Sequence, residues 1–95
     1  MKLRVGDTFQ HTGHGPQGWT QLADTKLNED GRFPVKAGID VSNNDARGVI
    51  GTITMLSGNQ AVMFTPALAY CRFSVWSHDW LEEHANVWKR KEKTK

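Results

Sequence analysis

The sequence predicts one mainly-β domain, a small five-stranded barrel with a long first loop and a short C-terminal helix. Three observations predict it: short segments that alternate apolar and polar residues, turn-forming residues between them, and a helical spacing near the C-terminus. Successive side chains of a strand point to opposite faces, so alternation with period two indicates a strand with one buried face. The 95 residues suffice for one domain with one core.

The first half of the chain predicts two strands separated by a long loop. Residues 3–10 place three apolar side chains on one face and predict the first strand. Residues 11–32 show no period and are rich in glycine, so we expect a loop of a length that is often functional. Residues 33–41 alternate most cleanly, and Pro34 indicates that this strand begins at a sheet edge.

The second half predicts three more strands. Residues 48–56 are rich in β-branched residues and predict a central strand that bends at Gly51. Residues 57–60 carry a hairpin signal, because a Gly-Asn pair can supply the positive φ of a tight turn. We expect the return strand at 61–65 and a fifth strand at 70–76.

Residues 77–88 predict a helix, with Asp79 as its N-cap and Glu82 completing a capping-box spacing. The predicted helical stripe consists of Trp80, Leu81, His84, Val87 and Trp88. A single turn at 78–81 followed by a last short strand remains open. The domain is then residues 1–88, and residues 89–95 form a basic, flexible tail.

The net charge of +2 conceals an uneven distribution. The tail carries five basic residues and one acidic residue, so the remaining 88 residues are slightly acidic. The single cysteine, Cys71, cannot form an internal disulfide, and its apolar neighbours predict a buried thiol. The sequence shows neither a signal peptide nor an apolar stretch long enough for a membrane span, so we expect a cytoplasmic protein.

Four short segments resemble the SH3-like barrel superfamily, which includes KOW-type barrels: Val5–Phe9, Gly48–Ile53, Val62–Phe64 and Trp80–Glu82. The resemblance implies an opening strand, a central strand, a strand that pairs with the central one, and a short turn that closes the sheet. The long first loop and the helical C-terminal stripe depart from it. An OB-fold is the nearest rival, but the turn at 57–60 leaves no room for that fold's helix. Short motifs of this kind support a fold and not a function.

Enzymatic activity is not expected, because the sequence lacks a phosphate-binding glycine loop, a nucleophile elbow and a paired-carboxylate motif. His11 and His14 could supply half of a metal site, with further candidates at His78, Asp79 and His84. Nothing in the sequence requires these two groups to meet, so we expect no metal and no cofactor. Residues 28–31 fail the ligand pattern of a calcium loop and predict a turn.

The first functional hypothesis is therefore a non-enzymatic protein-binding module, plausibly a small regulator or inhibitor. Small accessory proteins of phages and mobile elements offer the analogy. The contact residues would come from the long loop and from an exposed aromatic surface: His11, His14, Gln17, Trp19 and Trp76. The C-terminal tryptophans could instead pack into the core. The turns at 42–47 and 57–60 would form a nearby rim.

The second hypothesis is a nucleic-acid-binding barrel. Its backbone contacts would be Arg4, Lys36, Arg47, Arg72, Lys89, Arg90 and Lys91. Tyr70 or Trp76 could stack on bases. The acidic body of the domain disfavours this hypothesis, because strong nucleic-acid binders concentrate positive charge on the fold. The sequence leaves the oligomeric state open.

Overall fold

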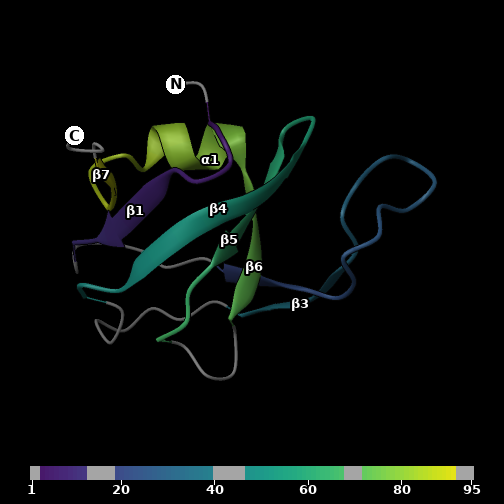
Figure 1. Cartoon of the computed structure of the whole chain (residues 1–95), viewed down its shortest axis with the longest axis horizontal. Coiled ribbons are helices and arrows are strands. Elements are labelled where there is room, and N and C mark those ends of the chain that lie inside the picture. The colour runs from purple at the N-terminus through teal and green to yellow at the C-terminus, as the bar shows by residue number, and fades with distance from the viewer. Residues whose placement is uncertain (1–2, 13–18, 40–46, 68–71, 92–95) are drawn as a thin grey trace.

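The computed structural model describes residues 3–12, 19–39, 47–67 and 72–91, which form a seven-stranded antiparallel sheet and one short helix (Figure 1). The elements are β1 (Thr8–His11), β2 (Trp19–Leu22), β3 (Val35–Ile39), β4 (Ile50–Ser57), β5 (Gln60–Phe64), β6 (Phe73–Ser77), α1 (His78–Glu83) and β7 (Trp88–Lys91). The strand order is β3-β2-β6-β5-β4-β1-β7. The mainly-β prediction is confirmed, whereas the closed five-stranded barrel is wrong, because β3 and β7 remain separate edges of an open sheet.

Two strands are additional to the five that the sequence predicts. β2 falls inside the expected loop at 11–32. β7 corresponds to the last short strand that the sequence left open as the alternative to a longer helix, and it occupies the start of the expected tail. Neither four-residue strand has a clear apolar alternation, and the charged side chains of β7 suit an edge strand, where they discourage pairing with other chains. β1 starts later than expected, because a turn with Gly6 at φ 97° precedes it.

The centre of the sheet is a meander of β4, β5 and β6. The β4–β5 hairpin turns at Gly58, whose φ of 56° confirms the hairpin signal in the sequence. β1 pairs with β4 on one side and β7 on the other. On the opposite flank, the β2–β3 hairpin joins the sheet through the pairing of Gln21 with Ser74 of β6.

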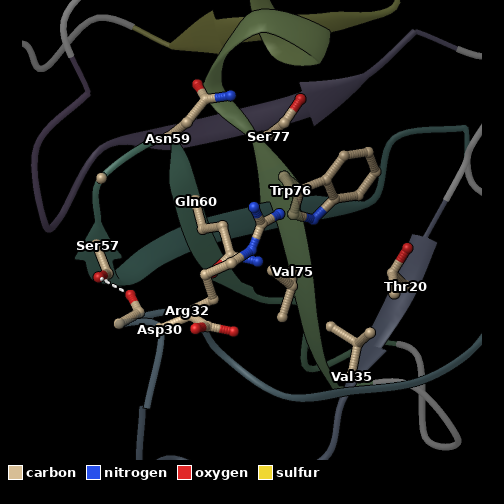
Figure 2. A pocket seen from close by; sticks show the side chains of 12 residues that line it. Thr20, Asp30, Arg32, Val35, Ser57, Asn59, Gln60, Val75, Trp76 and Ser77 are labelled. Atoms are coloured by element: carbon tan, nitrogen blue, oxygen red, sulfur yellow. Dashed lines mark hydrogen bonds between the residues drawn. The ribbon is translucent and has the colours of Figure 1, made fainter. Parts of the chain in front are cut away.

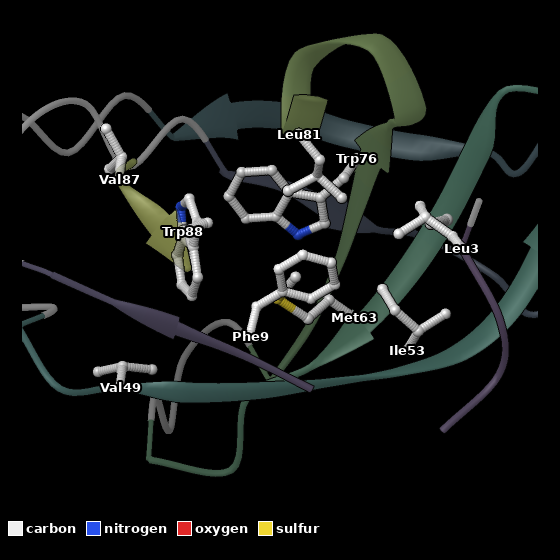
Figure 3. Packing of buried hydrophobic residues seen from close by; sticks show 10 residues of the cluster. Leu3, Phe9, Val49, Ile53, Met63, Trp76, Leu81, Val87 and Trp88 are labelled. Atoms are coloured by element: carbon white, nitrogen blue, oxygen red, sulfur yellow. The ribbon is translucent and has the colours of Figure 1, made fainter. Parts of the chain in front are cut away.

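The main core lies on one face of the curved sheet, beneath α1 (Figure 3). Trp76 of β6 and Trp88 of β7 meet edge to face there, with ring centroids 5.3 Å apart. The buried members of this cluster are Leu3, Phe9, Val49, Ile53, Ala61, Met63, Trp76, Leu81, Val87 and Trp88. A second cluster lies on the other face and consists of Phe33, Val62 and Val75, with Leu22 and Met55 packed against it.

The helix is shorter than the sequence predicts. Its N-cap is Ser77, whose hydroxyl oxygen accepts a hydrogen bond from the Trp80 N–H, and Asp79 lies within its first turn. The helix ends before His84, so the predicted stripe through Val87 and Trp88 is wrong. These two residues reach the core from the following turn and from β7. Among the described residues, no helix has the length and apolar character needed to cross a membrane.

Candidate functional site

The segment between β2 and β3, residues 23–34, projects from the body as a loop that we call the arm (Figure 1). Its residues 23–32 are all exposed. The side-chain oxygen of Asn28 accepts hydrogen bonds from the backbone N–H groups of Asp30 and Arg32, both at 3.0 Å. Gly31 supplies the left-handed conformation of this turn, with φ 75°. Internal hydrogen bonds therefore define the arm's shape.

Two further hydrogen bonds tie the arm to the β4–β5 hairpin. The Phe33 N–H donates to Oε1 of Gln60 at 2.7 Å, and the Ser57 hydroxyl donates to the Gly31 carbonyl at 2.7 Å. The Phe33 side chain is 5% exposed and anchors the base of the arm in the second apolar cluster. The arm is thus held against the sheet at a fixed position.

A solvent-open groove of about 470 Å³ lies between the arm, the hairpin turn and β6 (Figure 2). Arg32 extends from the arm into it, and Val35 and Val75 provide apolar surface. The lining residues are Thr20, Asp30, Gly31, Arg32, Val35, Ser57, Gly58, Asn59, Gln60, Val75, Trp76 and Ser77. Among the described residues, the lining combines one arginine, several hydrogen-bonding side chains and apolar contacts.

Among the residues that the structure describes, the lining of the groove includes neither histidine nor cysteine. The Ser57 hydroxyl donates to the Gly31 carbonyl, and the Ser77 oxygen caps α1. A serine nucleophile needs an adjacent general base, and these described contacts supply none to either hydroxyl.

Two of the predicted contact residues lie in the core. His11 is 1% exposed, and its ring packs edge-on against Trp88 at 4.9 Å between centroids. Trp76 is 3% exposed, and its indole N–H donates to the Ser74 hydroxyl at 2.7 Å. The burial of His11 does not fit its predicted contact role, whereas Trp76, although mostly buried, is one of the residues that line the groove.

The remaining predicted contacts are Trp19, His14 and Gln17. Trp19 belongs to β2, where its backbone is paired with Ile39. His14 and Gln17 lie outside the described residues, as does most of the predicted rim at 42–47. The other predicted rim, the turn at 57–60, lines the groove. The candidate site therefore lies in the later part of the predicted loop, on the arm.

The basic residues of the second hypothesis are spread over the sheet. Lys36 lies on β3 at one edge, whereas Lys89, Arg90 and Lys91 lie on β7 at the other. The β7 placement corrects the expectation that these three belong to a frayed tail. Arg90 forms an ion pair with Asp7. Arg4, Arg47 and Arg72 are exposed, at the turn before β1, the turn before β4 and the start of β6.

One group of potential metal ligands occurs among the described residues. His78 Nδ1 lies 4.0 Å from an Asp79 carboxylate oxygen and 3.7 Å from a Glu82 carboxylate oxygen. Both carboxylates are exposed, and such clusters at a protein surface are common without an ion. His11, the other half of the site considered from the sequence, lies in the core against Trp88.

No family model, no curated protein and no solved structure matches this chain. The sequence shows the turn at 28–31, but it contains no local signal for Gln60, whose partner Phe33 is 27 positions away. Arg32 and Gln60 were therefore missed as site residues.

Proposed function

We propose that this protein is a non-enzymatic protein-binding module, a small regulator or inhibitor, and that the arm and the groove contact its partner. The observation that carries the proposal is the ordered, projecting arm beside an open groove. A loop that already holds its bound shape loses little conformational entropy on association. Two exposed apolar side chains accompany it: Leu27 on the arm is 48% exposed and Val35 at its base is 47% exposed.

The resemblance to SH3-like barrels is compatible with this role. Its four segments fall at or next to β1, β4, β5 and α1, and β4 pairs with both β1 and β5. We propose that β7-β1-β4-β5-β6 is an opened form of such a barrel and that the β2–β3 hairpin is an insertion in its first loop. The arm is the tip of that insertion.

Site-specific photocrosslinking tests the proposed function. A photoreactive phenylalanine analogue replaces Leu27 in one variant and Val5 in a matched control. Val5 is 60% exposed but does not line the groove. In the source cell, position 27 should capture a defined protein and position 5 should not.

Affinity measurements with the purified partner then show how much Leu27 contributes to binding. Leu27→Ser should weaken binding about fivefold, since the exposed half of a leucine contributes about 1 kcal/mol when it is buried. Val5→Ser should leave binding unchanged. Equal capture from both positions, or equal binding of both variants, would contradict the proposed site.

Nucleic-acid binding remains the alternative proposal, and a salt titration against generic DNA and RNA tests it. Binding through phosphate contacts falls steeply with salt. Because the basic residues divide between opposite edges of the sheet, we expect no binding even at low salt. Tight, strongly salt-dependent binding would favour the alternative.

A further inference from the structure

Two hydrogen-bonding side chains of the groove, Gln60 and Ser77, act as acceptors within the protein and keep donors. Oε1 of Gln60 accepts the Phe33 N–H, which leaves the side-chain NH₂ group with two donors. The Ser77 oxygen accepts the Trp80 N–H at 3.0 Å, which leaves the hydroxyl proton to be donated. Both residues line the groove. A ligand that enters the groove therefore meets the remaining donors of Gln60 and Ser77.

Arg32 adds the strongest donors. Its backbone N–H donates to the side-chain oxygen of Asn28, so the position of the Arg32 backbone is defined. No carboxylate among the described residues forms an ion pair with its guanidinium, although Asp30 is on the same arm. Figure 2 shows the Asp30 and Arg32 side chains leaving the arm in different directions. A guanidinium presents five N–H donors in a plane that matches a carboxylate.

Within the protein-binding role proposed above, on which this inference rests, we propose that the groove receives an aspartate or glutamate side chain from an extended segment of the partner. Arg32 is the charged anchor, and the Gln60 NH₂ and Ser77 hydroxyl supply further donors. Val35 and Val75 contact aliphatic side chains that flank the acidic residue in the partner's sequence. Among the described residues, the lining holds one arginine and one carboxylate, which suits a monoanion better than a phosphate dianion, because phosphate recognition typically uses arginine clusters.

Two capped five-residue peptides serve as probes, Ala-Val-Glu-Val-Ala and its Gln-centred counterpart. Binding is followed by ¹H–¹⁵N NMR on the whole protein, at the side-chain signals of Arg32 and Gln60. The Glu peptide should shift both signals saturably, and the Gln peptide should bind about tenfold more weakly, as expected for losing a charge-assisted hydrogen bond.

Three variants locate the effect. Arg32→Gln should weaken the Glu peptide about tenfold. Gln60→Glu keeps an oxygen for the Phe33 N–H but places a negative charge in the groove, so it should abolish binding of the Glu peptide. Lys26→Gln removes an equal charge from the same arm outside the groove and should have no effect. The Phe33 amide signal reports in each case whether the arm is still tethered.

The inference is overturned if both peptides bind alike, if neither binds at millimolar concentration, or if Lys26→Gln matters as much as Arg32→Gln. Binding of a phosphoserine peptide without the Glu peptide would also overturn it. If the acidic peptide fails while crosslinking from position 27 still captures a partner, the protein-binding role survives and only the carboxylate specificity falls.

Discussion

Gly51 lies in β4 with no space for a side chain, and its replacement by alanine measures how tightly the main core is packed. A Cβ atom there would lie 2.3 Å from Sδ of Met63, 2.5 Å from its Cγ and 2.9 Å from Cγ2 of Thr65. Met63 and Thr65 are fully buried, so neither can move without displacing other core atoms. Overpacking of this kind typically costs about 1–3 kcal/mol.

Urea unfolding of purified Gly51→Ala should therefore show a free energy of unfolding lower by about 1–3 kcal/mol. In a domain of this size, each kcal/mol corresponds to roughly 4–8 °C in Tm. Met63→Ala alone should cost about 2–5 kcal/mol through its cavity. The double variant should cost less than the sum, by about 1 kcal/mol or more, because the new methyl group occupies space that Met63 vacates.

Full additivity of the two changes, or a Gly51→Ala variant as stable as the wild type, would refute this account of the packing between β4 and β5. Additivity would mean that the alanine acts through the backbone and not through contact with Met63. Stability equal to the wild type would mean that the core has space at this position.

Four other substitutions test three separate features of the fold. Ser77→Ala should lower the free energy of unfolding by about 1 kcal/mol through loss of the N-cap, while Asp79→Ala changes it by less than about half of that, as measured by urea unfolding. Asp7→Asn should cost about 1 kcal/mol in low salt by removing the ion pair with Arg90, and the difference from the wild type should shrink in high salt. Trp88→Ala should cost about 3–5 kcal/mol and lower the Tm accordingly, because Trp88 is fully buried; a small effect would mean that β7 is dispensable.

The sequence is informative where a structural feature depends on nearby residues. The β4–β5 hairpin follows from Gly58, which adopts the positive φ that its turn requires. The period-two alternation that runs through Phe9 also continues to His11, and both are buried. A signal for the core position of His11 was therefore present, although its place at the edge of a glycine-rich segment favoured a loop.

The C-terminal segment shows where local pattern fails. Val87 and Trp88 follow His84 at helical spacing, yet a short apolar run fits a helix and a strand equally well. Pairing of β7 with β1 decides between them, and that pairing joins residues about eighty positions apart in the sequence. The open sheet could not be predicted for the same reason. β2 and β7 are strands because they pair with neighbouring strands in the sheet, and their own sequences do not alternate between apolar and polar residues.

The groove could not be predicted for a related reason. Its shape depends on hydrogen bonds from the arm to Ser57 and Gln60, and each bond joins residues 26 or 27 positions apart. The sequence predicts the turn at 28–31, but it does not predict that the arm bonds to Ser57 and Gln60.

Hydrogen exchange at the Phe33 amide tests most directly whether the arm is tethered in the protein without its partner. The hydrogen bond to Gln60 predicts that this amide is protected in the wild type. In Gln60→Ala its exchange should accelerate by about tenfold or more, while Val62 and Val75 in the central sheet keep their protection. Exchange of the wild-type Phe33 amide at the rate of an unstructured peptide would contradict the preformed groove and, with it, the binding role proposed for the arm.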